Sequence, residues 1–363
     1  MSQIRRLDAK AGGSPGHAVM YLKGGCTDPL APYPTVQVCP ENEVDRNDPD
    51  HGVGISVNKW FRNVNWVAVP SKKLFFDGNL EPGQRLTQER YDAAVQSALD
   101  RGVFRGVQVH ADHPAGQDPD RMAEFVANDS IATDFALRFA RSIHCVRVPV
   151  TRSMLERIIE YLNGLNQEYA TGEADYQWSG YSDNCVHTLH NALAHASVWP
   201  PKSVRSIKLR QLFNVALSAN TFIDLAVRAA DYPIDDPRQI ERDAQARTSL
   251  LEYGWLPGGH GVALRRQKVV QDNDLFDTRF QIFVLEGFLF PYGNKQAVMD
   301  MSEDARYVEV RSNLRKFNAK YQAILAERPE EPDSDFLTAY YEYIAAELAR
   351  VQAHLDRLGV ERR

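Results

Sequence analysis

Residues 181–194 read YSDNCVHTLHNALA, a polar turn followed by an apolar segment with helical spacing. Ser182 or Asp183 can cap such a helix, because both side chains accept hydrogen bonds from the free N–H groups of a first turn. Cys185 then falls in the first turn, where those N–H groups and the helix dipole favour a thiolate. The stretch therefore predicts a helix that begins with a candidate nucleophile, although a small buried core cysteine fits the same spacing.

Helical patterns also surround this stretch. Thr151 precedes a run in which Leu155, Ile158, Ile159 and Leu162 recur three and four residues apart, which predicts a helix that ends near Gly164. The WPP sequence at 199–201 ends the helix that begins near Cys185, because proline cannot continue a helix. Further helices are expected between Thr87 and Gly102, over 120–141 and over 208–230.

Short β patterns bounded by turn residues occur between the helices. In HGVGISVN the apolar residues Val53, Ile55 and Val57 alternate, which places them on one face of a strand. The expected strands are AVMYLKG (18–24), HGVGISVN (51–58), WVAVPSKKLFFDG (66–78, one or two strands), HCVRVPV (144–150), GWLPGGHGVALRRQKVV (254–270) and FDTRFQIFVLEG (276–287). The fold class that follows is α+β, with a small antiparallel sheet packed on helices.

The C-terminal 60 residues carry a heptad pattern on two segments separated by RPEEPDSD. The apolar positions are Tyr307, Val310, Leu314, Phe317, Tyr321 and Ile324, then Leu337, Tyr341, Ile344, Leu348, Val351, Leu355 and Leu358. This spacing predicts two helices with an apolar seam each. An antiparallel hairpin packed on itself and on the body fits the pattern, and a homodimer formed through these helices remains the alternative.

Composition and charge exclude several classes of protein. The chain has 363 residues, 44% of them hydrophobic, and its 42 basic and 48 acidic residues give a net charge of −6. No basic face dominates, so a nucleic-acid partner is not expected. The most apolar run, QIFVLEGFLF, is short and contains Glu286, so we expect no membrane span. Residues 1–17 lack the apolar core of a secretory signal, so a cytoplasmic location is expected, with export by another route left open.

Four cysteines in a chain of this length do not form a disulfide framework. Cys26 and Cys39 flank a proline-rich loop and could pair if the protein is exported. Cys145 and Cys185 complete the set.

A cysteine nucleophile needs a base, and histidine is the usual one. His51 opens the strand 51–58, where its ring would lie at the end of the sheet, within reach of a helix N-terminus. His260 in PGGHGVAL also opens a strand and is the rival. With His260 the nucleophile comes first in the chain, and with His51 the base comes first, so the two histidines predict opposite chain orders.

The order of His51–Gly52, then RSIHCVRVPVTRSMLERIIEYLNGLN, then DNCVHTLHNAL resembles the permuted papain-like superfamily. That group includes lecithin:retinol acyltransferase-like enzymes and related bacterial cysteine hydrolases. The tetrad Asn184-Cys185-Val186-His187 is similar to the Asn-Cys-Glu-His box of the acyltransferase branch, with Val in place of Glu. The resemblance covers residues 18–200. It implies a permuted papain-like core in which Cys185 is the nucleophile and His51 the general base.

The resemblance also implies a third, polar residue on the strand after His51, which would orient the imidazole. Asn63 and Asn65 both fit, and Asn65 is preferred. The implied reaction is a two-step acyl transfer on an amide or ester, by a hydrolase or an acyltransferase, with no cofactor. The substrate would be a small molecule, a lipid or a peptide, and the residues expected to contact it are Asn184, Trp178 and Tyr181.

Two alternative functions belong to different classes of protein. Histidine and carboxylate side chains could hold Zn or Fe, and the candidates are His110, Asp112 and His113, together with His187, His190 and His195. The spacing of His187 and His190 is not that of an HExxH helix. The second alternative is an inactive binding or scaffold protein that keeps the fold.

The expected organisation has four parts. Residues 1–17 form a flexible arm, and 18–200 form the papain-like core with a helical insertion around 80–142. Residues 201–300 form an accessory region that completes the cleft, and 301–363 form the helical hairpin.

Overall fold

A computed structural model of the chain describes most of its regular elements. The described residues are 18–28, 30–33, 35–40, 52–57, 62, 66–69, 89, 93, 96–97, 99–100, 108, 110, 142–145, 148, 150–179, 183–198, 218–230, 232–256, 265–268, 297, 300–301 and 303–359. They form a mixed α+β structure, as the sequence predicts. Nearly all of the helical insertion expected around 80–142 lies outside them.

The chain divides into two compact units, each with more contacts within itself than with the other. The first unit comprises Met1–Ile143, Met154–Thr221 and Gln267–Leu285, and the second comprises His144–Ser153, Phe222–Arg266 and Glu286–Arg363. The strands β6 (Ser142–Cys145) and β7 (Arg265–Lys268) pair with each other, and each crosses a boundary of this division. β6 begins before the strand expected over 144–150 and is shorter.

The first unit contains a three-stranded antiparallel sheet of β1 (Met20–Lys23), β4 (Gly52–Ser56) and β5 (Val67–Val69), in the order β1-β4-β5. Each strand lies within a range expected from the sequence. All residues from Gly52 to Val57 are buried. Because successive side chains of a strand point to opposite faces, β4 is covered on both faces, which the alternating pattern of Val53, Ile55 and Val57 did not indicate.

A small hairpin of β2 (Gly25–Thr27) and β3 (Val36–Val38) follows β1 directly. A disulfide joins Cys26 to Cys39 across it, with 5.0 Å between the Cα atoms. The N–H of Cys39 also donates to the Gly24 carbonyl at 2.8 Å. Disulfides persist in oxidising compartments, and this is the pairing that the sequence analysis linked to export.

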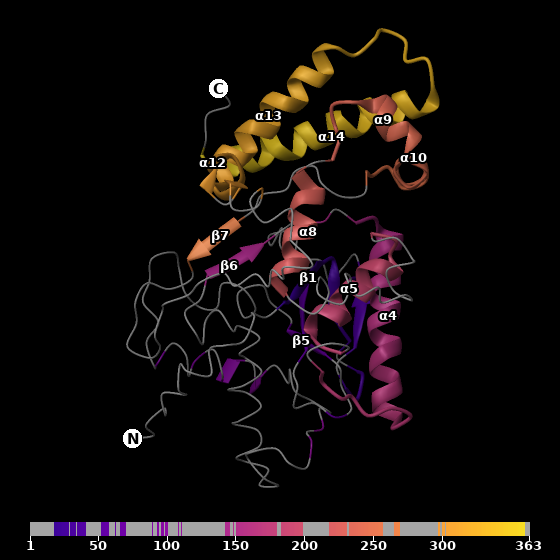
Figure 1. Ribbon diagram of the computed structural model, residues 1–363, viewed down its shortest axis with the longest axis vertical. Coiled ribbons are helices and arrows are strands. Elements are labelled where there is room, and N and C mark those ends of the chain that lie inside the picture. Colours follow the sequence, from indigo (N-terminus) through magenta and orange to yellow (C-terminus); the bar gives the residue numbers. More distant parts are fainter. Residues whose placement is uncertain are drawn as a thin grey trace, which may run out of the picture. The chain divides into compact units, whose positions relative to one another are not determined.

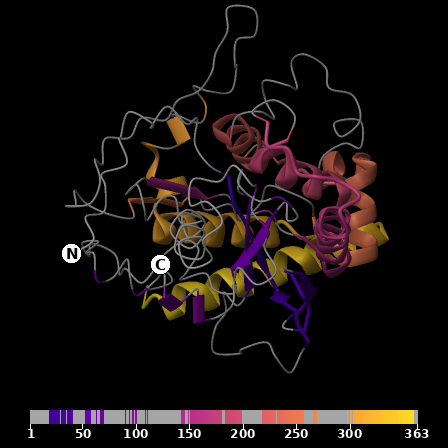
Figure 2. The ribbon, with the colours of Figure 1, turned by 90° about the horizontal axis from the view of Figure 1, so that it is seen from below.

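The helix α4 (Arg152–Thr171) contacts the segment that leads into β5 and the β2–β3 hairpin. Its predicted stripe of Leu155, Ile158, Ile159 and Leu162 is buried. The indole N–H of Trp66, just before β5, donates to the Leu162 carbonyl at 2.7 Å. The Asn163 side chain makes two hydrogen bonds with the backbone of Val36 in β3. Figures 1 and 2 show α4 alongside these strands, nearly end-on in Figure 2.

The prediction that this helix ends near Gly164 is wrong. α4 continues to Thr171 and ends at Gly172, whose φ of 75° is the left-handed conformation that commonly follows a helix. Glycine in a helix costs only about 1 kcal/mol relative to alanine. The apolar contacts on either side of Gly164 outweigh a penalty of that size.

The second unit is built from helices around one apolar core. Its main elements are α9 (Pro237–Arg242), α10 (Ala244–Tyr253), α12 (Ala305–Val308), α13 (Val310–Ala326) and α14 (Asp335–Arg357), and the division of the chain falls within α8 (Ser218–Ala230). The core takes residues from α9, α10, α13 and α14. The Tyr340 hydroxyl donates to the carbonyl of Ile234, and Lys320 forms an ion pair with Asp235 at 3.1 Å.

The C-terminal helices form the predicted hairpin, visible in Figure 1 as the two long helices α13 and α14. The seam residues Phe317, Tyr321, Ile344 and Leu355 are buried in the core of the unit. The apolar seam is therefore used within the chain. A homodimer through these helices stays a prediction, and it would need a different face from the one the heptad pattern suggested.

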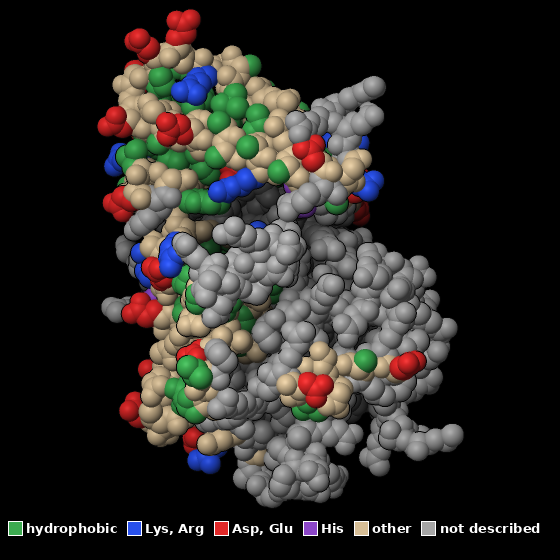
Figure 3. Space-filling model, turned by 180° about the vertical axis from the view of Figure 1, so that it is seen from behind, with side chains coloured by type: hydrophobic (Ala, Val, Ile, Leu, Met, Phe, Trp, Pro, Cys, Tyr) green, Lys and Arg blue, Asp and Glu red, His purple; other side chains and the backbone are tan. Residues whose placement is uncertain are grey.

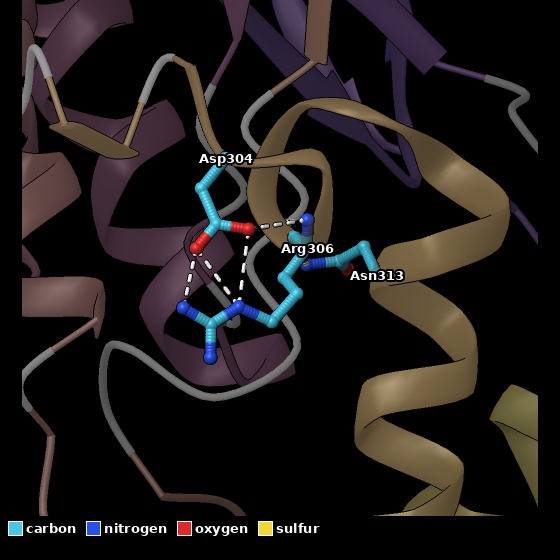
Figure 4. A network of polar contacts seen from close by, with 3 residues as sticks. All are labelled: Asp304, Arg306 and Asn313. Atoms are coloured by element: carbon cyan, nitrogen blue, oxygen red, sulfur yellow. Dashed lines mark hydrogen bonds and ion pairs between the residues drawn. The ribbon is translucent and has the colours of Figure 1, made fainter.

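A short corner interrupts the first of these helices. The sequence predicts one helix from Tyr307 onward, but α12 ends at Val308 and α13 starts at Val310. Asp304 caps α12 through the N–H of Arg306 at 2.9 Å, and the Arg306 guanidinium donates to both carboxylate oxygens of Asp304. The Asn313 side chain donates to the Arg306 carbonyl at 2.7 Å (Figure 4). This network fixes the bend and lowers the pKa of Asp304.

Figure 3 shows one face of the molecule with acidic and basic side chains interspersed over its described part. Among the described residues, no helix combines the length and the apolar composition that crossing a bilayer would require.

Candidate functional site

The helix α5 (Cys185–His195) begins at the candidate nucleophile. Its N-cap is Asn184, whose backbone is extended with φ −142° and ψ −176°. The Asn184 Oδ1 accepts hydrogen bonds from the N–H of Val186 at 2.8 Å and of His187 at 3.3 Å. The prediction that Ser182 or Asp183 caps the helix is therefore wrong, and asparagine is as good a cap as either residue.

Cys185 is the first residue of α5 and a free, buried thiol. Burial raises the pKa of the Cys185 thiol above its ordinary value. The backbone N–H groups of Ala18, Val186 and Cys185 itself act in the opposite direction and lower this pKa. The helix start thus favours the thiolate as the sequence predicts, but desolvation is the larger effect, so the resting group is a thiol.

The donor at Ala18 connects the site to the sheet. Ala18 lies two residues before β1, whose register pairs Met20 with Ile55 of β4. α5 therefore begins beside the start of β1, and the sulfur is held by groups from two distant parts of the chain. The sequence offered no signal for this contact, because backbone N–H groups are not distinguished by residue type.

The loop that leads into α5 is closed on itself. Ser179 and Asp183 form an isolated antiparallel bridge, in which the Ser179 N–H donates to the Asp183 carbonyl at 2.8 Å. The same carbonyl accepts the hydroxyl of Tyr176 at 3.2 Å. Tyr176 is fully buried, and its phenol interacts electrostatically with the Cys185 thiol. The sequence analysis did not single out Tyr176, although it lies in the aromatic loop just before the helix.

The Asp183 side chain lies among tyrosines. Its charge interacts with the phenols of Tyr161 and Tyr169 on α4 and with that of Tyr176. Partial burial raises the pKa of Asp183 to about 6. A carboxyl group two residues before Cys185 therefore titrates close to neutral pH.

Two histidines of α5 are buried near its start. The Nδ1 atom of His187 lies 3.0 Å from the Asn184 Oδ1. Because a carbonyl oxygen only accepts, His187 carries its proton on Nδ1 and offers Nε2 as the basic nitrogen. Burial, and then the charge of His187, lower the pKa of His190 to about 4. His195 lies at the exposed end of α5, with its ring 5.8 Å from that of Tyr161.

The structure describes only some of the remaining predicted site residues. Trp178 lies in the loop before α5 with 48% of its surface exposed. His51, Asn63, Asn65, Tyr181 and His260 lie outside the described residues. The structure therefore brings Asn184 and Cys185 together at the start of α5 and places Trp178 in the same loop as Tyr176.

The alternative of a metal-dependent enzyme has no cluster of candidate ligands in the described part of the chain. Among the described residues, no three histidine, cysteine, aspartate or glutamate side chains come together in a way that could hold a metal ion. His110 instead donates from Nε2 to the Tyr176 carbonyl at 3.1 Å. Asp112 and His113 lie outside the described residues.

No protein-family model, curated protein or solved structure matches the chain. The candidate site is therefore judged on its own geometry.

Proposed function

We propose that the protein is a cysteine-dependent acyl-transfer enzyme with Cys185 as its nucleophile. The observation that carries this proposal is a free, buried thiol at the first residue of a helix, where the backbone N–H groups of Ala18 and Val186 favour the thiolate. Donors in this arrangement stabilise a thiolate, and after attack the same N–H groups can stabilise the oxyanion of a tetrahedral intermediate. The permuted papain-like fold is part of the proposal, and the short antiparallel sheet beside α5 supports it.

The reaction has two steps. The base takes the Cys185 proton, the sulfur attacks an ester or amide carbonyl, and the bond to the alcohol or amine breaks as that group receives the proton. Water or a second nucleophile then attacks the thioester and releases the acyl group. Because burial keeps the resting sulfur protonated, the base has to act when the substrate is bound.

His51 is the base that the family resemblance suggests. It directly precedes Gly52, which pairs with Lys23 at one end of β1, whereas the sulfur is bonded by Ala18 beyond the other end. At about 3.3 Å per residue these two points lie about 17 Å apart along the strand. A direct transfer from Cys185 to His51 therefore requires the chain before β4 to turn back over the sheet, and His260 remains the rival.

The test uses p-nitrophenyl acetate as a generic acyl donor and mass spectrometry to find the acetylated residue. We expect a burst of p-nitrophenol and an acetyl group on Cys185. Cys185→Ala should abolish the burst, and Cys145→Ala, which removes another thiol, should retain it. A burst of unchanged size in Cys185→Ala would rule out the nucleophile. His51→Ala and His260→Ala, tested separately, identify the base by which one slows the burst.

A further inference from the structure

Tyr176 is held in place by hydrogen bonds from every polar group it has. Its N–H donates to the Arg62 carbonyl at 3.2 Å, and its carbonyl accepts from His110 Nε2 at 3.1 Å. Its hydroxyl donates to the Asp183 carbonyl at 3.2 Å. The ring packs edge-on against Tyr169, with 5.7 Å between the centroids. A fully buried side chain with these contacts has a single position in the fold.

The hydroxyl contact acts directly on the start of α5. The carbonyl of Asp183 belongs to the peptide that leads into Asn184, the N-cap, and Cys185 follows. The Ser179 N–H bonds the same carbonyl, so two donors fix this peptide. The phenol also lies close enough to Cys185 for the thiol to raise the pKa of Tyr176. One side chain therefore contacts the entry of the helix and lies within electrostatic range of the sulfur.

We propose that Tyr176 is a positioning residue for Cys185: its hydroxyl anchors the Asp183 peptide, and its ring keeps the sulfur buried and aligned with its backbone donors. His110 and Arg62 hold Tyr176 through its backbone. This inference rests on the proposed function, because it concerns the position of the same nucleophile.

Removal of the hydroxyl should loosen the start of α5 without emptying the core. Burial is the largest cause of the raised thiol pKa, so added access of water should lower that pKa and expose the sulfur. The aligned donors would be lost at the same time, which slows acyl transfer. In the variant, the rate of alkylation by a small reagent should therefore rise and the rate of acyl transfer should fall. Substitution of a residue with a merely structural role would change neither rate at a temperature well below unfolding.

The experiment measures iodoacetamide alkylation of Cys185 in the full chain, resolved by peptide mass spectrometry from pH 6 to 10. In Tyr176→Phe we expect alkylation at neutral pH to rise about fivefold, because the sulfur is more accessible and more ionised. The burst with p-nitrophenyl acetate should fall about tenfold, because the nucleophile is less well oriented. Tyr321→Phe is the matched control, because Tyr321 is also fully buried and its hydroxyl has no hydrogen-bond partner among the described residues. It should change neither rate.

Equal alkylation profiles for the wild type, Tyr176→Phe and Tyr321→Phe would overturn the inference and leave Cys185 as the nucleophile. If Tyr176→Phe does not fold, His110→Ala decides, because it removes only the donor to the Tyr176 carbonyl and should shift alkylation in the same direction by a smaller factor. A wild-type protein that gives no Cys185-dependent burst contradicts the proposed function. The alkylation profiles still decide the role of Tyr176 in that case.

Discussion

The Oδ1 atom of Asn184 accepts hydrogen bonds from the backbone of α5 and also lies 3.0 Å from the Nδ1 atom of His187. One amide oxygen thus caps the helix that begins with the proposed nucleophile. The same oxygen sets the tautomer of His187, three residues after Asn184. This finding gives Asn184 a structural role, and its predicted contact with the substrate remains to be tested.

The first prediction concerns this cap. Asn184→Ala should lower the free energy of unfolding by about 2 kcal/mol, because it removes the cap and leaves the buried His187 ring without its acceptor. Urea unfolding at pH 7 measures the change. Asn184→Asp keeps the acceptor and should retain most of the stability. Equal losses in both variants would show that the cap contact does not matter.

His190 should make the protein sensitive to acid. Its pKa is lowered to about 4 in the folded state, so the folded protein disfavours its charged form. The stabilisation is fully present above the ordinary value of 6.5 and is lost as the pH falls through 4. The difference corresponds to about 3 kcal/mol. Urea unfolding of His190→Gln between pH 7 and 4 should show a smaller loss than the wild type, and parallel curves would contradict this role.

Asp183 should act in the opposite direction. Its pKa is raised to about 6, so the folded protein prefers the protonated form. That contribution is present below 3.8 and is lost as the pH rises through 6. Because the group is partly exposed, we expect about 1 kcal/mol. Asp183→Asn should be more stable than the wild type at pH 8 and no more stable at pH 4, as measured by thermal unfolding at both values.

The disulfide should contribute to stability. Cys26 and Cys39 are 13 residues apart, and closing a loop of this size stabilises a fold by about 3 kcal/mol. Cys26→Ser with Cys39→Ser should lower the melting temperature, and dithiothreitol should have the same effect on the wild type but none on the double variant. A wild type that melts identically with and without the reductant would show that the pair is not formed in solution.

Two glycines offer a paired test of the backbone. A Cβ at Gly52 would lie 2.4 Å from the Leu22 carbonyl oxygen, whereas a Cβ at Gly164 would meet nothing within 4 Å. Gly52→Ala should therefore separate β1 from β4 and destabilise the protein by more than about 2 kcal/mol. Gly164→Ala should stabilise it by up to about 1 kcal/mol, because alanine favours a helix. Chemical denaturation of both variants checks the opposite signs.

The sequence predicted those features that depend on local spacing. The buried stripe of α4, the start of α5 near Cys185 and the two C-terminal helices follow from apolar periodicity. The hairpin β2–β3, the helices α9 and α10 and the corner between α12 and α13 were not predicted. The hairpin is held by the distant Asn163 side chain, and the corner by the polar network of Asp304, Arg306 and Asn313, and neither contact leaves an apolar pattern in the sequence. The N-cap was misplaced by one residue or two, since Ser182, Asp183 and Asn184 are all good caps.

The candidate site, like the fold, could be predicted from the sequence only in part. The helix start at Cys185 can be read from residue types, but the burial that raises its pKa depends on β1 and on Tyr176. Arg62 and Tyr176 are 114 positions apart, and their contact is between backbone atoms, which leave no pattern in a sequence. His51 and His260 correspond to opposite chain orders of base and nucleophile, so the variants His51→Ala and His260→Ala are the decisive experiment.

The pairing of Asn163 with Val36 has a consequence for solubility. The amide accepts from the Val36 N–H at 3.1 Å and donates to its carbonyl at 2.7 Å, the same two bonds that a neighbouring strand would make. An open strand edge is a template on which other chains can assemble into aggregates. In β3 a helix side chain occupies that edge at Val36, so the hairpin is closed to edge-to-edge association at this position.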